Sequence, residues 1–132
     1  MPMQVELVSP ERVLYTGEAQ MVLARTEDGE IGFLPNHAPF VATLVPGRVR
    51  IVKEDGSEEL AAVHSGFVEV RDNRVIILSD VAELAGQIDV ERARRAKQAA
   101  EERLRAGDDP EAEAALDRAE TRIDVAENRQ RS

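Results

Sequence analysis

Two arginines, Arg118 and Arg122, are the residues of this 132-residue sequence whose type and spacing best suit ligand binding. Four residues apart, they would lie on one face of a helix, where like charges cost about 0.2–0.5 kcal/mol. Neither has an acidic residue three or four positions away to offset its charge. Planar guanidinium groups bind phosphates and carboxylates through paired hydrogen bonds, so the two side chains could clamp an anionic ligand or partner. A solvated helix face explains the spacing equally well.

A second candidate is the run Ile88-Asp89-Val90-Glu91-Arg92-Ala93. Asp89 is a favoured residue for the start of a helix, because its carboxylate can accept a hydrogen bond from a free N–H group of the first turn. The residues that follow have the composition of a helix. From the residues alone we therefore favour an ordinary helix start here over a ligand site.

A third candidate is the segment Gly29-Glu30-Ile31-Gly32-Phe33-Leu34-Pro35-Asn36-His37-Ala38-Pro39-Phe40. Pro35 and Pro39 remove two backbone donors and fix two φ angles, so the residues between them cannot form regular strand. We expect a stiff loop that presents Asn36 and His37. Two interpretations stay open with equal weight: a rigid turn between strands, or a loop that presents these side chains to a partner, since binding residues often lie on ordered loops.

The rest of the sequence argues against catalysis by this chain. It has no cysteine and only two histidines, His37 and His64, which excludes disulfides, thiolate chemistry and multi-histidine metal centres. It contains no glycine-rich phosphate loop and no dinucleotide-binding glycine pattern. Neither histidine lies in a signature of nucleophilic catalysis, and no acidic cluster has metal-ligand spacing. We predict a non-enzymatic chain with no catalytic residue and no metal site.

The charge and hydropathy also exclude classes of partner. The chain has 26 acidic and 17 basic residues, a formal net charge of -9. Such a balance argues against non-specific binding to nucleic acid or to anionic lipid, which both need a basic surface. No apolar run approaches the roughly 20 residues that span a bilayer, and the first residues lack the signal-peptide pattern. We therefore expect an intracellular soluble chain.

The composition changes near Gly86 and divides the chain into two predicted domains, 1–85 and 86–132. The first holds six of the eight glycines, five of the six prolines and all four aromatic residues. Its short β-branched segments, separated by turn residues, predict about ten strands in an N-terminal antiparallel β-sandwich. The clearest strands are expected at 5–8, 21–24, 40–45, 49–52, 67–70 and 75–78.

The second domain predicts a C-terminal two-helix hairpin. One helix begins after Asp89 and runs to about Arg105, where Gly107 supplies a stop, and the next begins at 108–111 with an acidic cap and a proline. Alanine-rich stripes on the two helices can face each other, but alanine buries little area, so the pair should be marginal alone. We infer that the sandwich, a partner or a ligand holds the hairpin. The stripes are Val90, Ala93, Ala96 or Lys97, Ala100 and Leu104, and Ala112, Ala115, Leu116, Ala119, Ile123 and Ala126.

Several segments together resemble the epsilon subunits of bacterial F-type ATP synthases, over essentially the whole chain. One is the loop between Gly29 and Pro39, which is quite specific for this family. The β-rich half followed by two alanine-rich helices supports the resemblance independently. The other matching segments are Val8-Ser9-Pro10, Ser65-Gly66-Phe67-Val68-Glu69-Val70 and Val75-Ile76-Ile77-Leu78.

The resemblance implies a rotor subunit of the central stalk that helps couple the gamma subunit to the ring of c subunits, while ATP is made on alpha and beta. It implies a peripheral location on the cytoplasmic face of the cell membrane, reached only through the complex. By similarity, the loop with Glu30, Asn36 and His37 lies towards the c-ring and the foot of gamma.

The family also implies a mobile hairpin, which lies against the sandwich or extends along gamma. The extended form blocks rotation and inhibits ATP hydrolysis. Its basic helical face meets an acidic segment of the beta subunit, and here Arg94, Arg95 and Arg103 could form that face together with their basic neighbours Arg92, Lys97 and Arg105.

Some bacterial members bind regulatory ATP in the folded hairpin through a motif that resembles Ile/Leu-Asp-x-x-Arg-Ala. The resemblance therefore favours a ligand role for the paired arginines and implies no other cofactor. One departure is a shorter turn around Gly107, which would change the height of the arginines relative to the motif. The alternative is a purely structural rotor subunit whose hairpin binds no nucleotide. The matching residues are Glu83, Ile88, Asp89, Arg92, Ala93, Arg118 and Arg122.

Overall fold

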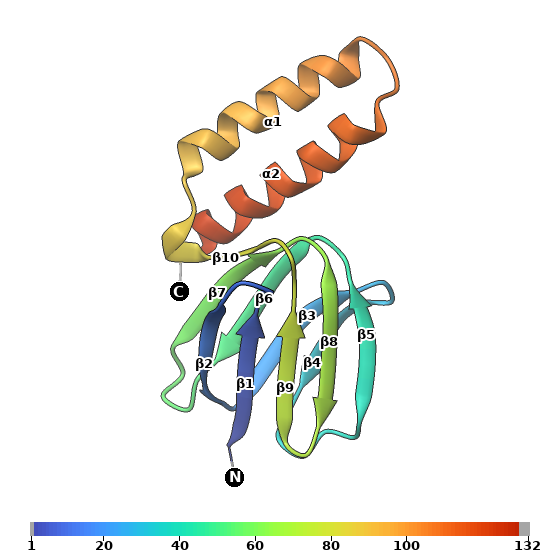
Figure 1. Ribbon diagram of the computed structural model, residues 1–132. Coiled ribbons are helices and arrows are strands. Elements are labelled where there is room, and N and C mark those ends of the chain that lie inside the picture. The colour runs from blue at the N-terminus through green and yellow to red at the C-terminus, as the bar shows by residue number, and fades with distance from the viewer. Residues whose placement is uncertain (1, 130–132) are drawn as a thin grey trace.

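A computed structural model describes residues 2–129 and shows a strand-rich part followed by a helical part (Figure 1). Residue 1 and residues 130–132, the outer ends of the two predicted domains, lie outside the described residues. A 3₁₀ turn at Ala85–Gln87 separates the strands from the helices. The elements of residues 2–129 are β1 (Met3–Val8), β2 (Val13–Ala19), β3 (Met21–Thr26), β4 (Gly29–Phe33), β5 (Phe40–Leu44), β6 (Gly47–Val52), β7 (Glu58–Val63), β8 (Gly66–Arg71), β9 (Arg74–Leu78), β10 (Ala82–Leu84), α1 (Val90–Arg105) and α2 (Pro110–Arg129).

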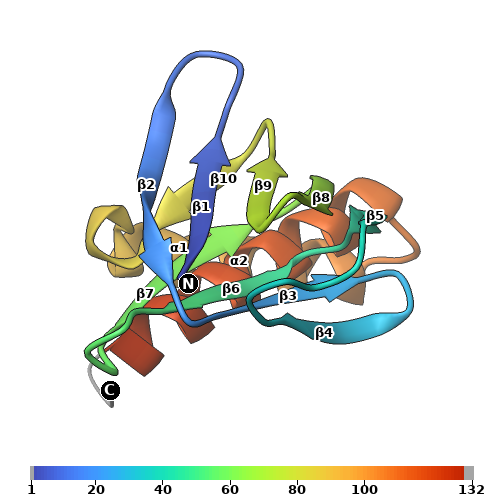
Figure 2. The same ribbon diagram turned by 90° about the horizontal axis from the view of Figure 1, so that it is seen from below.

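The strands form one hydrogen-bonded sheet that folds over on itself as a sandwich. Its order is β10-β7-β6-β3-β5-β8-β9-β1-β2, and β4 pairs with β3. Seen from below, β3, β4, β6 and β7 lie in one layer and β1, β8 and β9 in another (Figure 2). The predicted sandwich of about ten strands is confirmed. Its pairs are antiparallel except that β1 pairs with β9 in parallel, which is possible because most of the domain connects these two strands.

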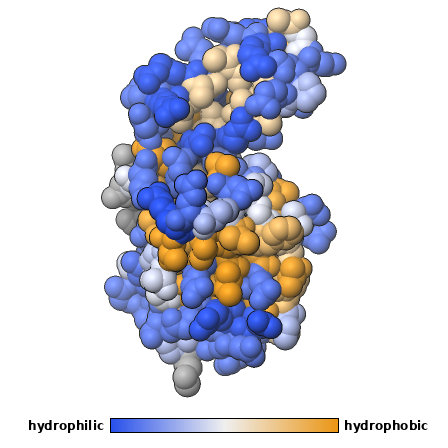
Figure 3. Space-filling view, in the orientation of Figure 1, coloured by the Kyte–Doolittle hydropathy of each residue, from blue (hydrophilic) through white to orange (hydrophobic). Residues whose placement is uncertain are grey.

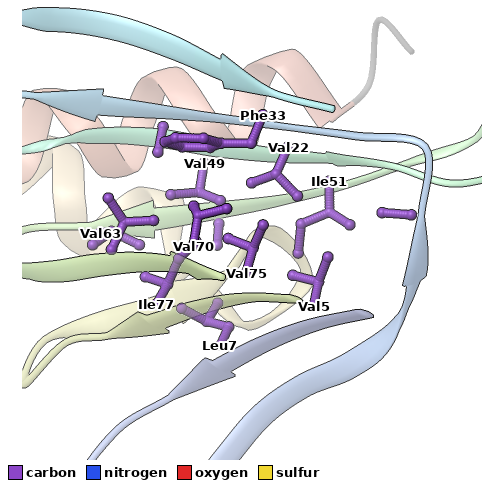
Figure 4. Packing of buried hydrophobic residues seen from close by; sticks show 14 of the residues in the cluster. Val5, Leu7, Val22, Phe33, Val49, Ile51, Val63, Val70, Val75 and Ile77 are labelled. Carbon is purple, nitrogen blue, oxygen red and sulfur yellow. The ribbon is translucent and has the colours of Figure 1, made fainter. Parts of the chain in front are cut away.

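The core lies between the two layers and follows the alternation of the strands. Successive side chains of a strand point to opposite faces, so every second residue faces inwards. The buried residues shown in Figure 4 include Val5 and Leu7 of β1, Val22 of β3 and Phe33 of β4. Strand β7 is the exception, because it is buried along both faces from Leu60 onwards.

Helix α1 begins and ends, and α2 begins, at the expected residues. The Asp89 carboxylate accepts the backbone N–H of Arg92 at 3.1 Å and caps α1. Gly107 ends the turn after α1 with φ of +146°, a conformation that favours glycine. The Asp109 carboxylate accepts the backbone N–H of Ala112 at 3.1 Å and caps α2. The predicted alanine seam is confirmed by the burial of Ala93, Ala100, Ala112, Ala119 and Ala126, whereas Ala96 is exposed and Lys97 partly buried.

The sandwich holds the hairpin, through a second apolar cluster that is separate from the core. In this cluster Val125 of α2 is fully buried and packs with Leu60 and Ala62 of β7 and with Ala85, while Ile88 packs against its edge. Figure 1 shows α2 lying across the end of the sandwich next to β7 and β10, with α1 outside it. Val125 lies outside the predicted stripe because it faces the sandwich and not α1. Of the three supports expected for the hairpin, the sandwich therefore provides one directly.

Shortening Val125 to alanine should weaken this docking contact more than it weakens the sandwich. Loss of two buried methyl groups costs about 1–3 kcal/mol. Hydrogen exchange of the full chain should then show faster exchange of the α1 and α2 amides, with the amides of β1, β3 and β8 unchanged. Val13→Ala is the control, because Val13 is 59% exposed. Uniformly faster exchange in both parts would contradict this assignment of Val125.

Candidate functional site

An ion pair joins the two parts of the chain beside this cluster. Arg122 of α2 donates from Nε to the carboxylate of Glu83 on β10. Both side chains are about two-thirds buried, so water screens the pair less than it screens a surface pair. Glu83 stands opposite Ala62 in the β7–β10 ladder, which places the ion pair next to the apolar cluster. The structure thus brings together two residues of the predicted nucleotide site.

Arg118 is also paired, with an acid that lies more than one helical turn away. Its Nη2 donates to Glu111 Oε1 at 3.2 Å, two helical turns earlier on α2. Both arginines of the predicted clamp therefore have acidic partners in the docked hairpin. The interaction is exposed on the Glu111 side, where pairs of this kind contribute about 0–1 kcal/mol.

The motif at the start of α1 is used mainly to build the helix. Asp89 is the N-cap and Ala93 is buried in the alanine seam. Ile88 packs against the apolar cluster of Val125, and Val125 lies about one helical turn after Arg122 on α2. Arg92 is exposed and forms no ion pair within the described part of the chain. The structure gathers Glu83, Ile88 and Arg122 but gives no contact that links Arg92 to Arg118 or Arg122.

The sequence interpretation missed His64, which lies at the same interface. Leu60, Ala62 and His64 alternate along β7 and its end, so the imidazole continues the row of side chains that faces α2. The residue is 5% exposed, and neither ring nitrogen has a hydrogen-bond partner. Burial first, and the charge of Arg122 next, lower the pKa of His64 to about 4. The available signal was the continuous apolar run of residues 60–63, which is typical of a strand covered on both faces, but the sequence does not say what covers the outer face.

A cleft of about 870 Å³ lies between α2 and the sandwich, but it is not the predicted nucleotide site. None of the seven residues matched to the nucleotide motif lines it. Arg48 Nη1 lies 3.9 Å from Asp124 Oδ1 near its wall, a long and partly exposed pair. The lining residues carry both signs of charge and are Arg25, Glu30, Val45, Pro46, Gly47, Arg48, Asp117, Glu120, Thr121 and Asp124.

The loop after β4 is held at several points and presents Asn36 at the surface. Asn36 has a left-handed φ of +66°, and its N–H donates to Asn73 Oδ1 at 2.9 Å. The ring of His37 packs edge-on against Phe33 with centroids 5.2 Å apart. Glu30 is not part of this loop, because it lies at the other end of β4, where it lines the cleft under α2. The structure therefore keeps Asn36 and His37 together and separates them from Glu30.

The arginines of the predicted basic face are partly engaged within the hairpin. Arg94 pairs with Glu91 at 2.7 Å and reaches Glu127 of α2 at 3.7 Å. Arg103 donates to Asp109 Oδ2 at 2.7 Å across the turn, and Arg95 is exposed. The pKa of Asp109 lies below its usual value, mainly because the Ala112 N–H donates to it and also because Arg103 does.

An exposed apolar patch covers the outer face of neighbouring strands of the sandwich. We define the patch as Val41 of β5, Phe67 of β8 and Leu78 of β9, which are 67%, 55% and 46% exposed. Phe67 stands directly opposite Leu78 in the β8–β9 ladder. Figure 3 shows apolar side chains gathered over this part of the sandwich. Contiguous exposed apolar surface of this kind marks interaction sites on other proteins.

Two further observations bear on ligands and membranes. Within residues 2–129 there is no group of three or more histidine, cysteine, aspartate or glutamate side chains arranged to hold a metal ion. In the same residues, neither helix has both the length and the apolar content needed to cross a membrane.

The arrangement defines a class of protein: a β-sandwich that carries a docked two-helix hairpin, with ion pairs between the second helix and the sandwich. Two family models match it in sequence, "ATP synthase, Delta/Epsilon chain, beta-sandwich domain" over residues 2–85 and "ATP synthase, Delta/Epsilon chain, long alpha-helix domain" over residues 87–127. The chain therefore belongs to the ATP synthase epsilon chain family, as the resemblance of its motifs predicted.

Individual relatives and solved structures agree with this membership. The chain is 48% identical to the ATP synthase epsilon chain of Shouchella clausii over 128 residues, 96% of each chain. It is 49% identical to that of Bacillus velezensis, over 95% of this chain and 97% of the relative. The same fold occurs in the Euglena gracilis mitochondrial ATP synthase, with a TM-score of 0.73 at 23% identity over 98% of this chain and 80% of the other. At this identity the likeness shows the fold alone.

Removing the side chain of Asn73 should loosen the loop while the sandwich keeps its fold. Asn73→Gly preserves the left-handed backbone, φ +60°, but removes the acceptor of the Asn36 N–H. We expect faster exchange of the Asn36 amide and broader resonances for His37. Asp72→Gly is the matched control, because Asp72 has φ of +52° in the same turn and is exposed. Equal effects of the two variants would show that the Asn73 side chain does not hold the loop.

Proposed function

We propose that this chain is a non-catalytic rotor subunit of the central stalk of an F-type ATP synthase, where it helps couple gamma to the c-ring. The observation that carries the proposal is the match of both parts of the chain to epsilon chains, over nearly their full length. The lack of a catalytic motif in the sequence supports a role in coupling. The protein then lies at the cytoplasmic face of the membrane, peripheral and bound through the complex.

Two surfaces suit contacts within such a stalk. The exposed apolar patch of Val41, Phe67 and Leu78 would be buried in a permanent contact with another subunit. Burial of this apolar surface would stabilise the assembly. The loop with Asn36 and His37 is ordered and lies at the end of the sandwich away from the hairpin, as expected for a contact with gamma or the c-ring. Glu30, beside α2, would belong to a separate contact.

The hairpin serves as a conformational inhibitor of ATP hydrolysis in this proposal. Its docking on the sandwich rests on one small apolar cluster around Val125, the partly buried pair of Arg122 with Glu83 and a long, partly exposed pair of α2 with β6, so the docked and released forms can be close in free energy. Unfolding of the hairpin would break the pairs of Arg94 with Glu127 and of Arg103 with Asp109. Arg94, Arg95 and Arg103 would then be free to meet acidic residues of alpha and beta.

ATP would act by stabilising the docked hairpin. Its phosphates would bind the guanidinium groups of Arg118 and Arg122, which lie one turn apart on α2, while Glu83 and the Ile88-Asp89 segment flank Arg122 from the sandwich side. One observation favours the alternative of a structural subunit that binds no nucleotide: Glu111 and Glu83 already neutralise both arginines. A ligand would have to displace these carboxylates.

Removal of the hairpin and weakening of its docking should change hydrolysis in opposite directions. Deletion of residues 87–132 removes the inhibitor, so ATP hydrolysis by the reconstituted complex should rise. Val125→Ala keeps the hairpin but favours its release, so hydrolysis should fall by several-fold while ATP synthesis is retained. Steady-state ATPase assays of the assembled enzyme measure both. Hydrolysis that is unchanged by either variant would exclude an inhibitory hairpin.

ATP titration of the purified chain by calorimetry tests the nucleotide role. We expect binding by the unmodified chain and at least tenfold weaker binding by Arg122→Ala, because the substitution removes a charge-assisted contact to phosphate. Arg105→Ala is the control, since Arg105 is an exposed arginine at the other end of the hairpin. Absence of heat at millimolar ATP, or equal loss in both variants, would favour the structural alternative.

A further inference from the structure

We propose that His64 makes the docking of the hairpin sensitive to pH, because a proton on its buried imidazole favours release of α2 from the sandwich. The inference concerns the hairpin of the chain itself. Only its consequence for hydrolysis rests on the proposed function.

In the docked form, His64 lies where a charge on its ring would have neither water nor a hydrogen-bond partner. It follows Leu60 and Ala62 in the row of β7 side chains that packs against α2, and 5% of the residue is exposed. Its backbone N–H donates to the Val81 carbonyl at 3.0 Å, which fixes the backbone beside β10. Both ring nitrogens are inaccessible to solvent and have no partner. A protonated imidazole carries two N–H donors, and burying them unpaired with a charge is costly.

The charges around the imidazole oppose a further positive charge. Arg118 and Arg122 face it from α2, and both lower its proton affinity. Glu83 faces it from β10 and acts in the opposite direction, but this carboxylate is already bound to Arg122. Asp80, in the connection between β9 and β10, is exposed. When α2 leaves, both arginines leave with it and the ring meets water, so protonation no longer carries this cost.

The sign of the effect follows from proton linkage. The docked form holds the pKa of His64 at about 4, whereas an exposed histidine titrates near its ordinary 6.5. Because docking lowers the pKa of His64, the neutral imidazole contributes fully to the stability of the docked form above pH 6.5. This contribution is lost as the pH falls towards 4. With these two values, docking weakens about tenfold at pH 5.5 and about thirtyfold at pH 5.

The second histidine provides a matched comparison within the chain. His37 lies in the partly exposed loop after β4, far from the hairpin, and its Nδ1 is 2.7 Å from the Ala38 carbonyl. Unlike His64, this ring has a polar partner and is partly exposed. His37→Gln should therefore leave the pH dependence of docking unchanged, whereas His64→Gln should remove it. If acid releases the hairpin, and if the released form inhibits as proposed, hydrolysis falls as the surroundings acidify.

Hydrogen exchange of the purified full chain tests the inference between pH 8 and pH 5, with rates corrected for the pH dependence of exchange itself. We expect protection of the α2 amides to fall about tenfold by pH 5.5 in the unmodified chain and in His37→Gln, with the amides of β3 and β8 retaining theirs. In His64→Gln the protection of α2 should not change with pH, whatever its absolute level. Protection of α2 that is independent of pH in the unmodified chain, or an equal fall in His64→Gln, would overturn the proposal.

A second variant keeps the test decisive if glutamine at position 64 prevents docking. Arg118→Gln retains His64 but removes one of the charges that oppose its proton, so the loss of α2 protection should be smaller at each pH than in the unmodified chain. A loss equal to that of the unmodified chain would contradict the role of these charges. ATPase assays of the complex test a different claim. If the hairpin does not inhibit hydrolysis, the proposed function is wrong, but the result of the hydrogen-exchange experiment on His64 still holds.

Discussion

The arrangement of the whole chain depends on the contact that α2 makes with the outer face of β7. This strand has apolar neighbours on both sides: Ala61 and Val63 belong to the sandwich core, while Leu60 and Ala62 contact Val125. The small side chain of Ala62 lets the helix approach closely, and Val125 fills the contact. One strand therefore contacts both the core and the hairpin, and release of the hairpin would leave the core of the sandwich covered.

The polar groups at this junction give the docked form a dependence on charge. Arg122 and Glu83 are paired at partial burial, and His64 lies beside them without a partner. In such a place of reduced dielectric constant, one added or removed charge changes the free energy more than it would on the surface. Under the two proposals made above, an anion bound to the arginines and a proton bound to the imidazole would act in opposite directions on the docking equilibrium. Nucleotide and pH would thus compete through a common contact.

The sequence predicted the parts of the fold that depend on local chemistry. The cap at Asp89, an acidic cap at the start of the second helix, the stop at Gly107 and the alternating core residues follow from neighbours in the chain, and the structure agrees. Contacts between distant segments could not be predicted in this way. The pair of Arg122 and Glu83 joins residues 39 positions apart, and the role of His64 depends on the helix that covers it. Arg118 has no acidic residue within one helical turn, and its partner Glu111 lies two turns away.

If the hairpin acts as proposed, the weakness of the alanine seam contributes to its release. Ala93 and Ala100 face Ala112 and Ala119 with little area to bury, and the ion pairs at the rim of the hairpin are largely exposed. Larger apolar residues in the seam would stabilise the closed helix pair. They would also leave an apolar stripe in water whenever the helices separate, which favours the closed form further. A seam of alanine keeps the cost of separating the helices small, so that in the proposed mechanism a few charges beside β7 and β10 would determine whether the hairpin is docked or released.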